Sequence, residues 1–433
     1  MTRAAYLAAP LALTGALALA GHARAAAPCE DLAKVKVAGA TITAVKAMPV
    51  GASQEIEVFG IPPLPAASAY CRVNATLAPT SSSSIRVEVW LPAEEAWNGK
   101  FMASGNGGYG GTLGGPRLAM RPAVQAGYAV AGTDMGHTED GAGGEANWAL
   151  GQHEKVVDWG YRANHETAVF AKALIAAYYG RGPRRAYFTG CSDGGREALM
   201  EAQRYPDDFD GIVAGAPANA WTRLMGSFAW TWKAVHENPD SRIPAAGLAV
   251  VQKAALAQCD KLDGVVDGVI EDPRRCRFDP VVVQCKDGQA TDCLTPAQVA
   301  GLRKLYQGPR DAKGRVILPG YPAGGEATPG AWPLWISGEK AQHPSFARSF
   351  FANFVYGNTG WRLAQMNLDK DLKAAEAIAP IVASDNPDLS AFKARGGKLI
   401  LFHGWSDAAI TPLATIRYYD AVRAKMGVKS ADA

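Results

Sequence analysis

The chain has 433 residues, of which 48% are hydrophobic and 20% charged, a composition typical of a globular protein with a large buried core. Its formal net charge is +3 and no block of basic residues stands out, which argues against nucleic acid and against a charged membrane surface as partners. A small neutral or mildly anionic molecule fits this charge better.

The first 25 residues are typical of a secretory signal peptide. Arg3 gives a positive start, an apolar stretch covers about residues 6–20, and Ala-Arg-Ala at 23–25 forms a small-x-small cleavage site. The apolar stretch is shorter than the roughly 20 residues of a membrane-spanning helix, so an anchor is the weaker interpretation. We therefore expect export to the periplasm or the medium, where disulfides can form.

Predicted strands and helices alternate along the next part of the chain. Strands are expected at 84–92, 99–105, 127–136, 184–191, 209–217 and 396–407, and helices at 164–180, 196–206 and 412–426. Such alternation is typical of the α/β class, with a mostly parallel sheet and helices on both faces.

Between about residues 218 and 387 this alternation is lost, and the segment holds four of the seven cysteines and six of the eleven tryptophans. We predict that it is an insertion, or lid, over the sheet, and refer to residues 218–387 as the insertion. The predicted organisation is a signal peptide at 1–25, a first core part at 26–217, the insertion, and a second core part at 388–433.

The seven cysteines cannot all pair with one another. Pairing of neighbours along the chain predicts the disulfides Cys29–Cys71, Cys259–Cys276 and Cys285–Cys293. Cys191 is the cysteine that this scheme leaves over.

A serine nucleophile is predicted at Ser192, directly after Cys191. Gly190, Ser192 and Gly194 form a G-x-S-x-G motif at the end of a predicted strand and the start of a predicted helix. The glycines allow a sharp turn, and the backbone N–H of Asp193 can point at a developing oxyanion. The alternative is an ordinary serine in a glycine-rich turn.

A second oxyanion donor is expected in the glycine-rich segment 104–111, from the N–H of Gly107 or Gly108. The same segment spells G-x-G-x-x-G, the dinucleotide-binding fingerprint, and Asp134 ends the next strand. Two considerations argue against dinucleotide binding. We expect Pro116 and Pro122 to interrupt the helix that must directly follow the glycine-rich turn. An exported protein also meets little of such a cofactor.

The acid of a hydrolase triad is predicted at Asp407, at the end of the last strand, but no histidine follows it. All seven histidines precede Asp407, whereas the Ser, Asp, His order places the base after the acid. His403 is the nearest substitute, and a structural role for it is favoured. His137 either lines a cleft or is a hydrogen-bonded loop histidine.

Three carboxylates lie close together between Cys259 and Cys276. Asp260, Asp263 and Asp267 fall within eight residues, and the Asp-Gly steps allow tight turns that bring carboxylate and carbonyl oxygens to one hard cation such as calcium. The spacing is not that of an EF-hand, and a pair of solvated turns is the alternative.

Several of these segments together resemble the tannase and feruloyl esterase family, which also contains hydrolases of terephthalate monoesters. The similar segments are WNGKFMASGNGG, GTDMGH, NHETAVFAKALI, AYFTGCSDGGREALMEAQRYPDDFDGIVAGAP, CDKLDGVVDGVIEDPRRC and LFHGWSDAAITP. The resemblance covers nearly the whole chain after the predicted signal peptide.

The resemblance implies an α/β-hydrolase core with an inserted lid, a triad that includes Ser192 and Asp407, and a calcium ion that braces the lid. The implied oxyanion donors are Asp193 and Gly108, and the implied calcium ligands are Asp260, Asp263 and Asp267 with the carbonyls of Val265 and Val269. In this family the cysteine before the serine pairs with a cysteine directly after the catalytic histidine. The resemblance therefore implies that a His-Cys pair lies beyond Ala433, and that the chain as given turns over little.

We conclude from the sequence that the chain is a secreted serine carboxylesterase acting on small esters of aromatic acids, such as feruloyl or galloyl esters. Six tryptophans of the insertion could stack on the acyl group, although packing is the simpler role for each: Trp221, Trp230, Trp232, Trp332, Trp335 and Trp361. A non-catalytic binding relative is the second hypothesis, and dinucleotide-dependent oxidoreduction a distant third.

Overall fold

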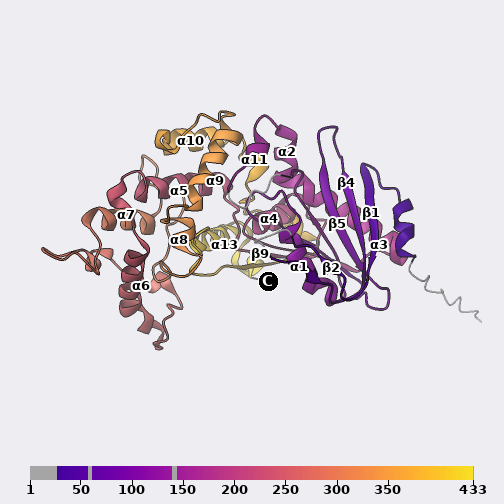
Figure 1. Cartoon of the computed structure of the whole chain (residues 1–433), viewed down its shortest axis with the longest axis horizontal. Helices are drawn as coiled ribbons and strands as arrows, with labels where there is room; N and C mark the ends of the chain where they lie inside the picture. Colours follow the sequence, from indigo (N-terminus) through magenta and orange to yellow (C-terminus); the bar gives the residue numbers. More distant parts are fainter. Residues whose placement is uncertain (1–26, 57–60, 139–143, 433) are drawn as a thin grey trace, which may run out of the picture.

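The computed structural model describes residues 27–56, 61–138 and 144–432 (Figure 1). The predicted signal peptide, at 1–25, lies outside the described residues. No helix in the described ranges is both long and apolar enough to cross a membrane.

An eight-stranded sheet forms the centre of the fold, in the order β1-β4-β5-β7-β6-β8-β9-β10. Its strands are β1 (Ala40–Met48), β4 (Tyr70–Leu77), β5 (Ile85–Pro92), β6 (Lys100–Ser104), β7 (Ala129–Thr133), β8 (Arg185–Cys191), β9 (Gly211–Gly215) and β10 (Lys398–Phe402). The five strands from β7 to β10 run parallel, and β1, β4 and β5 pair antiparallel. The predicted α/β class with a mostly parallel sheet is confirmed.

The antiparallel edge was not expected from the sequence, which indicated only an early strand around Cys71. In β4 the buried residues Val73, Ala75 and Leu77 alternate with half-buried polar ones, while most of β1 is exposed or half-buried. A short separate sheet pairs β2 (Ser53–Gln54) with β3 (Leu64–Pro65).

Three helices pack on the sheet: α1 (Gly114–Gln125), α3 (Ala163–Tyr179) and α4 (Asp193–Arg204). The expectation that Pro116 and Pro122 interrupt a helix is wrong, because both lie inside α1. Pro116 occupies the first turn, where its missing N–H has no helical partner to lose, and Pro122 is exposed near the end.

The remaining core helices are α2 (His153–Val157), α12 (Ser390–Ala394), α13 (Pro412–Met426) and α14 (Val428–Ala431). A π-helical turn (Asp158–Arg162) joins α2 to α3. The bounds of α13 are those that the sequence predicted.

The insertion consists of helices and loops between β9 and β10, and Figure 1 shows it extending to one side of the sheet. Its helices are α5 (Trp221–Val235), α6 (Ala245–Cys259), α7 (Pro296–Gln307), α8 (Trp332–Trp335), α9 (Gln342–Ser349), α10 (Leu368–Ala375) and α11 (Ala379–Val382). A second hydrophobic cluster, around Leu248, Leu302 and Trp332, lies within it. The predicted division of the chain at 218 and 387 stays a prediction.

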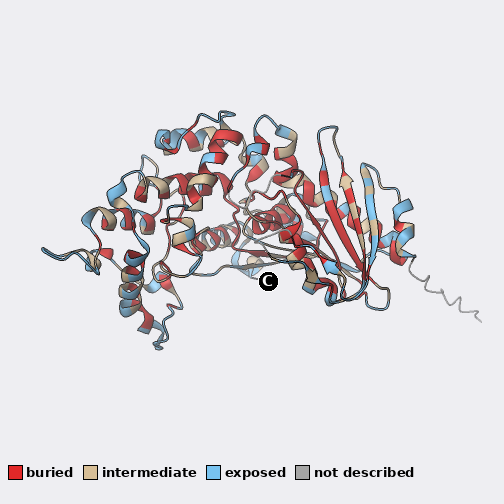
Figure 2. Ribbon diagram, in the orientation of Figure 1, coloured by how far each residue is buried: buried red, intermediate tan, exposed pale blue. Residues whose placement is uncertain are grey.

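Three disulfides stabilise the structure and confirm the predicted pairing: Cys29–Cys71, Cys259–Cys276 and Cys285–Cys293. Cys191 is free and exposed. Figure 2 shows α4, next to Cys191, as one of the most completely buried helices of the molecule.

Candidate active site

Ser192 lies at a sharp corner between strand β8 and helix α4. It is the single residue between the end of β8 at Cys191 and the start of α4 at Asp193, and its φ is 64° with ψ −122°. Few non-glycine residues adopt a positive φ, and such strain is typical of functional corners. The backbone N–H of Ser192 donates to the carbonyl of Gly215 at 3.0 Å, which ties the corner to β9.

Glycines make this corner possible because the backbones of strand and helix approach closely. A Cβ on Gly190 would lie 2.3 Å from the carbonyl oxygen of Gly194, and one on Gly194 would lie 2.8 Å from the carbonyl oxygen of Asn106. No side chain fits at those distances. The G-x-S-x-G spacing is thus a packing requirement at both glycines that flank the serine.

The glycine-rich segment 104–111, in which the sequence predicts an oxyanion donor and which we therefore call the oxyanion loop, runs beside this corner. The Gly194 N–H donates to the carbonyl of Asn106 at 2.9 Å, and the Gly107 N–H donates to Asn106 Oδ1 at 3.2 Å. The N–H groups of Gly108 and Asp193 have no hydrogen-bond partner within the described part of the chain. Of the two glycines that the sequence offered, Gly108 is therefore the one with an available donor.

Buried polar side chains hold the oxyanion loop in place. Asn106 Nδ2 donates to the carbonyls of Thr112 and Thr133, at 3.1 and 2.8 Å. His137 Nε2 lies 2.7 Å from the carbonyl oxygen of Tyr109, and its ring stacks on Trp148. His137 thus packs as a hydrogen-bonded loop histidine, the second of the two roles considered for it.

A cavity of about 560 Å³ opens at Ser192. The oxyanion loop, Cys191 and Asp193 form one wall, and apolar residues of the insertion form another. Those residues are Trp221, Leu224, Met225, Phe228, Leu334, Trp335 and Phe346. Of the six tryptophans that could stack on an acyl group, Trp221 and Trp335 therefore line the cavity. The wall that they help to form suits a flat apolar group.

Asp407 lies in the loop after β10, close enough to Cys191 to affect its titration. Burial, and then the charge of Asp407, raise the pKa of the Cys191 thiol. Asp407 Oδ1 accepts the N–H groups of Ala409 and Ile410 at 2.9 and 3.0 Å. These bonds give the carboxylate a fixed orientation.

A histidine of the insertion braces the loop that carries Asp407. His343, on α9, is fully buried against Phe228, and its Nε2 lies 3.2 Å from the carbonyl oxygen of Ala409. Burial lowers the pKa of His343 to about 3, so the ring is neutral at ordinary pH. The loop that carries Asp407 is thus held against the insertion by this contact.

His403 occupies a structural position. Its Nδ1 lies 2.8 Å from Thr415 Oγ1, and its Nε2 lies 2.9 Å from the carbonyl oxygen of Ile410 and 3.2 Å from Asp407 Oδ2. Both ring nitrogens are therefore engaged. No histidine of the described ranges makes a hydrogen bond to Ser192, and His22 lies outside those ranges.

Beneath the corner, Asp193 and Arg196 form a fully buried ion pair. Arg196 Nε donates to Asp193 Oδ1 at 2.5 Å, and its other nitrogens donate to the carbonyls of Trp159 and Gly160. The guanidinium lies 4.0 Å from the centre of the Trp159 ring. A hydrogen-bonded and stacked pair of this kind keeps the first turn of α4 rigid.

The acidic residues expected to bind calcium do not converge in this structure. Asp260 accepts the N–H groups of Asp267 and Gly268, while Asp263 and Asp267 each accept the N–H two residues on. Within the described ranges no three His, Cys, Asp or Glu side chains form a group that could hold a metal. As placed, these carboxylates stabilise turns, and their fit to a calcium ion would need them to rotate.

Two contributors to the site were missed in the sequence, Asn106 and Glu197. Asn106 stands inside the glycine run, and Glu197 is one of four buried charged or acidic residues on α4, with Asp193, Arg196 and Glu201. A polar residue at an inward position of a helix next to the nucleophile is the signal that could have identified Glu197.

Known proteins resemble this chain in sequence and in fold. The family profile described as tannase and feruloyl esterase matches residues 71–433. An uncharacterized esterase of Xanthomonas campestris is 39% identical over 429 residues, which cover 96% of this chain and 73% of that protein. Feruloyl esterase B of Aspergillus niger is 32% identical over 421 residues, covering 95% and 78%. The crystal structure of feruloyl esterase B from Aspergillus oryzae superposes with a TM-score of 0.84 and 31% identity, covering 92% and 78%.

Proposed function

This chain belongs to the tannase and feruloyl esterase family of carboxylic ester hydrolases, and from that membership we propose that Ser192 attacks esters of aromatic acids. The observation that carries the proposal is the strained corner, where Ser192 stands beside the available N–H groups of Asp193 and Gly108. An apolar cavity at the same serine supports an acyl group with an aromatic ring. The relatives named feruloyl esterases support the same substrate class.

The proposed reaction proceeds through an acyl-enzyme. Ser192 Oγ adds to the ester carbonyl carbon while its proton passes to a base, and the resulting oxyanion accepts the N–H groups of Asp193 and Gly108. The bond to the alcohol then breaks, and the alcohol leaves with that proton. Water repeats the addition at the acyl carbon and releases the acid and free Ser192.

We propose that the base is a histidine held beside Asp407 and Cys191, since no histidine of the described ranges makes a hydrogen bond to Ser192. The exposed thiol of Cys191 and the nearby Asp407 support this position for the base. With no histidine at Ser192, the chain is expected to hydrolyse esters slowly, because loss of a triad member removes most of the rate.

The test is chemical rescue of the missing base. We expect the chain to hydrolyse methyl ferulate or methyl gallate slowly, and added imidazole to raise the rate by acting as the base. Ser192→Ala should show no such increase, and a fluorophosphonate probe should label the wild type only when imidazole is present.

Three outcomes separate the possibilities. Fast Ser192-dependent hydrolysis without imidazole would show that a base is already in place. Equal imidazole effects in the wild type and in Ser192→Ala would remove Ser192 as nucleophile. Tight binding of ferulate with no labelling under any condition would favour the non-catalytic binding relative.

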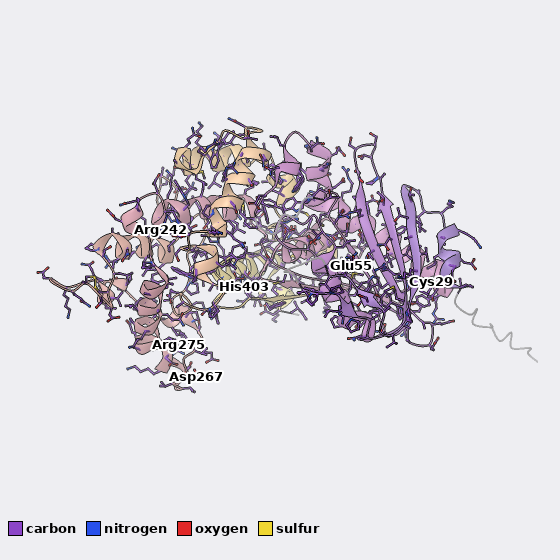
Figure 3. All side chains as sticks on the ribbon, viewed as in Figure 1. Cys29, Glu55, Arg242, Asp267, Arg275 and His403 are labelled. Carbon is purple, nitrogen blue, oxygen red and sulfur yellow. A yellow bond between two sulfur atoms is a disulfide. The ribbon has the colours of Figure 1, made fainter. Side chains whose placement is uncertain are left out.

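Export and a structural calcium ion are the remaining parts of the proposal. Three disulfides support an oxidising compartment, in keeping with export by the predicted signal peptide. The paired Asp-Gly turns support a calcium site formed by Asp260, Asp263 and Asp267 with the carbonyls of Val265 and Val269. Figure 3 shows Asp267 near Arg275 at the lower tip of the insertion, apart from His403, so such an ion would brace the insertion only.

A further inference from the structure

A buried glutamate lies between the two halves of the oxyanion site. We propose that Glu197 is a positioning residue that sets the spacing of the Asp193 and Gly108 N–H groups, and that it does so as a neutral carboxylic acid. This inference rests on the function proposed for Ser192. Glu197 itself touches neither the serine nor the cavity that opens at it.

The position of Glu197 joins the two elements that carry the donors. It lies on α4, four residues after Asp193, and its side chain reaches the oxyanion loop two residues before Gly108. Glu197 Oε2 accepts the backbone N–H of Asn106 at 3.1 Å. One side chain thereby fixes the loop that carries one donor to the helix that carries the other.

The carboxyl group of Glu197 and the backbone of the oxyanion loop are packed with no free space between them. A Cβ on Gly105 would lie 2.8 Å from Glu197 Oε2 and 2.7 Å from the Cα of Gly194, so the carboxyl group lies directly against the loop backbone. Because α4 and the loop are in van der Waals contact here, a shorter side chain at 197 would leave an unpaired amide and a void. Movement of the loop into that void would shift the Gly108 N–H.

The surroundings of Glu197 favour its neutral form. Only 2% of the residue is exposed, and Oε1 has no hydrogen-bond partner within the described part of the chain. Burial, and then the charge of Asp193, raise the pKa of Glu197 to about 8, while Arg196 lowers it. A buried carboxylate with an unpaired oxygen costs far more than the neutral acid.

Charged groups face Glu197 mainly from its own helix. On α4 they are Asp193, Arg196 and Glu201, and Glu201 is a second buried acid whose pKa burial also raises well above its usual range. On α3 the facing group is the neutral amide of Asn164. The oxyanion loop contributes only backbone atoms and the side chain of Asn106.

The protonation state has consequences for oxyanion binding and for stability. Ionisation of Glu197 above about pH 8 would add a negative charge directly behind the site that must bind an oxyanion. Because its folded pKa is raised above the ordinary value of 4.5, its contribution to stability is complete below pH 4.5 and is lost as the pH rises through about 8. Glu197→Gln keeps the acceptor for Asn106 and cannot ionise.

The experiment compares Glu197→Gln and Glu197→Ala with the same changes at Glu201, a buried acid on the same helix that makes no hydrogen bond to the loop within the described ranges. The first measurement is hydrogen exchange of peptides covering residues 105–111. The second is the Ser192-dependent affinity for styrylboronic acid, whose tetrahedral adduct mimics the oxyanion, between pH 6 and 10. Expressing the wild-type affinity relative to Glu197→Gln cancels the ionisation of the probe.

We expect Glu197→Ala to speed exchange in the loop and to weaken the boronate at least about tenfold, whereas Glu197→Gln stays close to the wild type at pH 7. Above about pH 8 the wild type should lose affinity relative to Glu197→Gln. The Glu201 variants should change the melting temperature only.

The inference is overturned if Glu201→Ala disturbs the loop as much as Glu197→Ala, or if Glu197→Ala leaves loop exchange unchanged. If the ratio of the wild-type to the Glu197→Gln boronate affinity stays constant as the pH rises through 8, the proposal that Glu197 is neutral is overturned. Absence of any Ser192-dependent boronate binding would instead count against Ser192 as nucleophile, and loop exchange would still decide the role of Glu197.

Discussion

Gly190 is a residue at which the corner around Ser192 has little tolerance for a side chain. Its missing side chain leaves room for the carbonyl of Gly194, 2.3 Å from where a Cβ would be. We expect Gly190→Ala to lower the free energy of unfolding by about 1–3 kcal/mol, because backbone must move to relieve the overlap. The matched control is Gly182→Ala, which meets nothing within 4 Å and should change stability by less than about 0.5 kcal/mol.

Urea unfolding of both variants measures this difference. Equal effects at the two glycines would mean that the corner relaxes freely, and the close approach of β8 and α4 would then not constrain Ser192.

At the level of single residues, the sequence predicts features that depend on spacing along the chain, and it does not predict features that depend on burial in the folded structure. The three disulfides follow from the order of the cysteines along the chain, and the sharp turn at Ser192 follows from its motif, while the catalytic role of Ser192 stays a prediction. Glu197 looks in the sequence like any solvated helical glutamate, and only the packing of the oxyanion loop over α4 makes it a buried acid. Its chemistry is a property of tertiary contact.

Among the elements, β10 is the one whose surroundings are least complete. It pairs with β9 on one side, and its other side is the edge of the sheet within the described ranges. Ile400 is 60% exposed and Phe402 53%. An apolar edge strand of this kind is a template for pairing with another chain.

We therefore expect the 433-residue chain to self-associate as its concentration rises, and Ile400→Lys to reduce that association because a charged edge resists pairing. Val50→Lys is the control, since Val50 is 67% exposed but lies in a turn away from β10. Light scattering across a concentration series gives the comparison. Equal reductions in both variants would mean that exposed apolar area, and not the strand edge, drives association.

Helices and strands could be predicted where one hydrophobic periodicity dominates the segment. The bounds of α13 and the strands from β5 to β10 were expected, because buried parallel strands and amphipathic helices have strong patterns. The length of α1 was not expected, because its two prolines disfavour a helix locally. Packing of α1 on β6 and β7 stabilises the helix despite these prolines.

For the molecule as a whole, the insertion is the part whose stability should respond to calcium. If Asp263 and Asp267 rotate to share an ion with Asp260, calcium at one hundred times its dissociation constant would add about 2.7 kcal/mol to folding. We expect calcium to raise the melting temperature and EDTA to reverse the rise. Asp263→Asn with Asp267→Asn should abolish the response, while Asp240→Asn, elsewhere in the insertion, should keep it.

Identical melting curves with calcium and with EDTA would leave these carboxylates as turn-forming residues, as they are placed here. The sequence could suggest such a site from its spacing but could not decide it, because convergence of carboxylates depends on side-chain rotation and on carbonyl directions.

The insertion also sets the order in which the sheet can be assembled during synthesis. β9 and β10 are neighbours in the sheet, yet roughly 180 residues separate them, which a ribosome needs about 10–35 s to add. Throughout that interval β9 is an unprotected edge, and the loop carrying Asp407 does not yet exist. The nascent chain thus has the proposed nucleophile, Ser192, long before it has the proposed acid, Asp407, and the two cannot meet until β10 and the loop after it have been added.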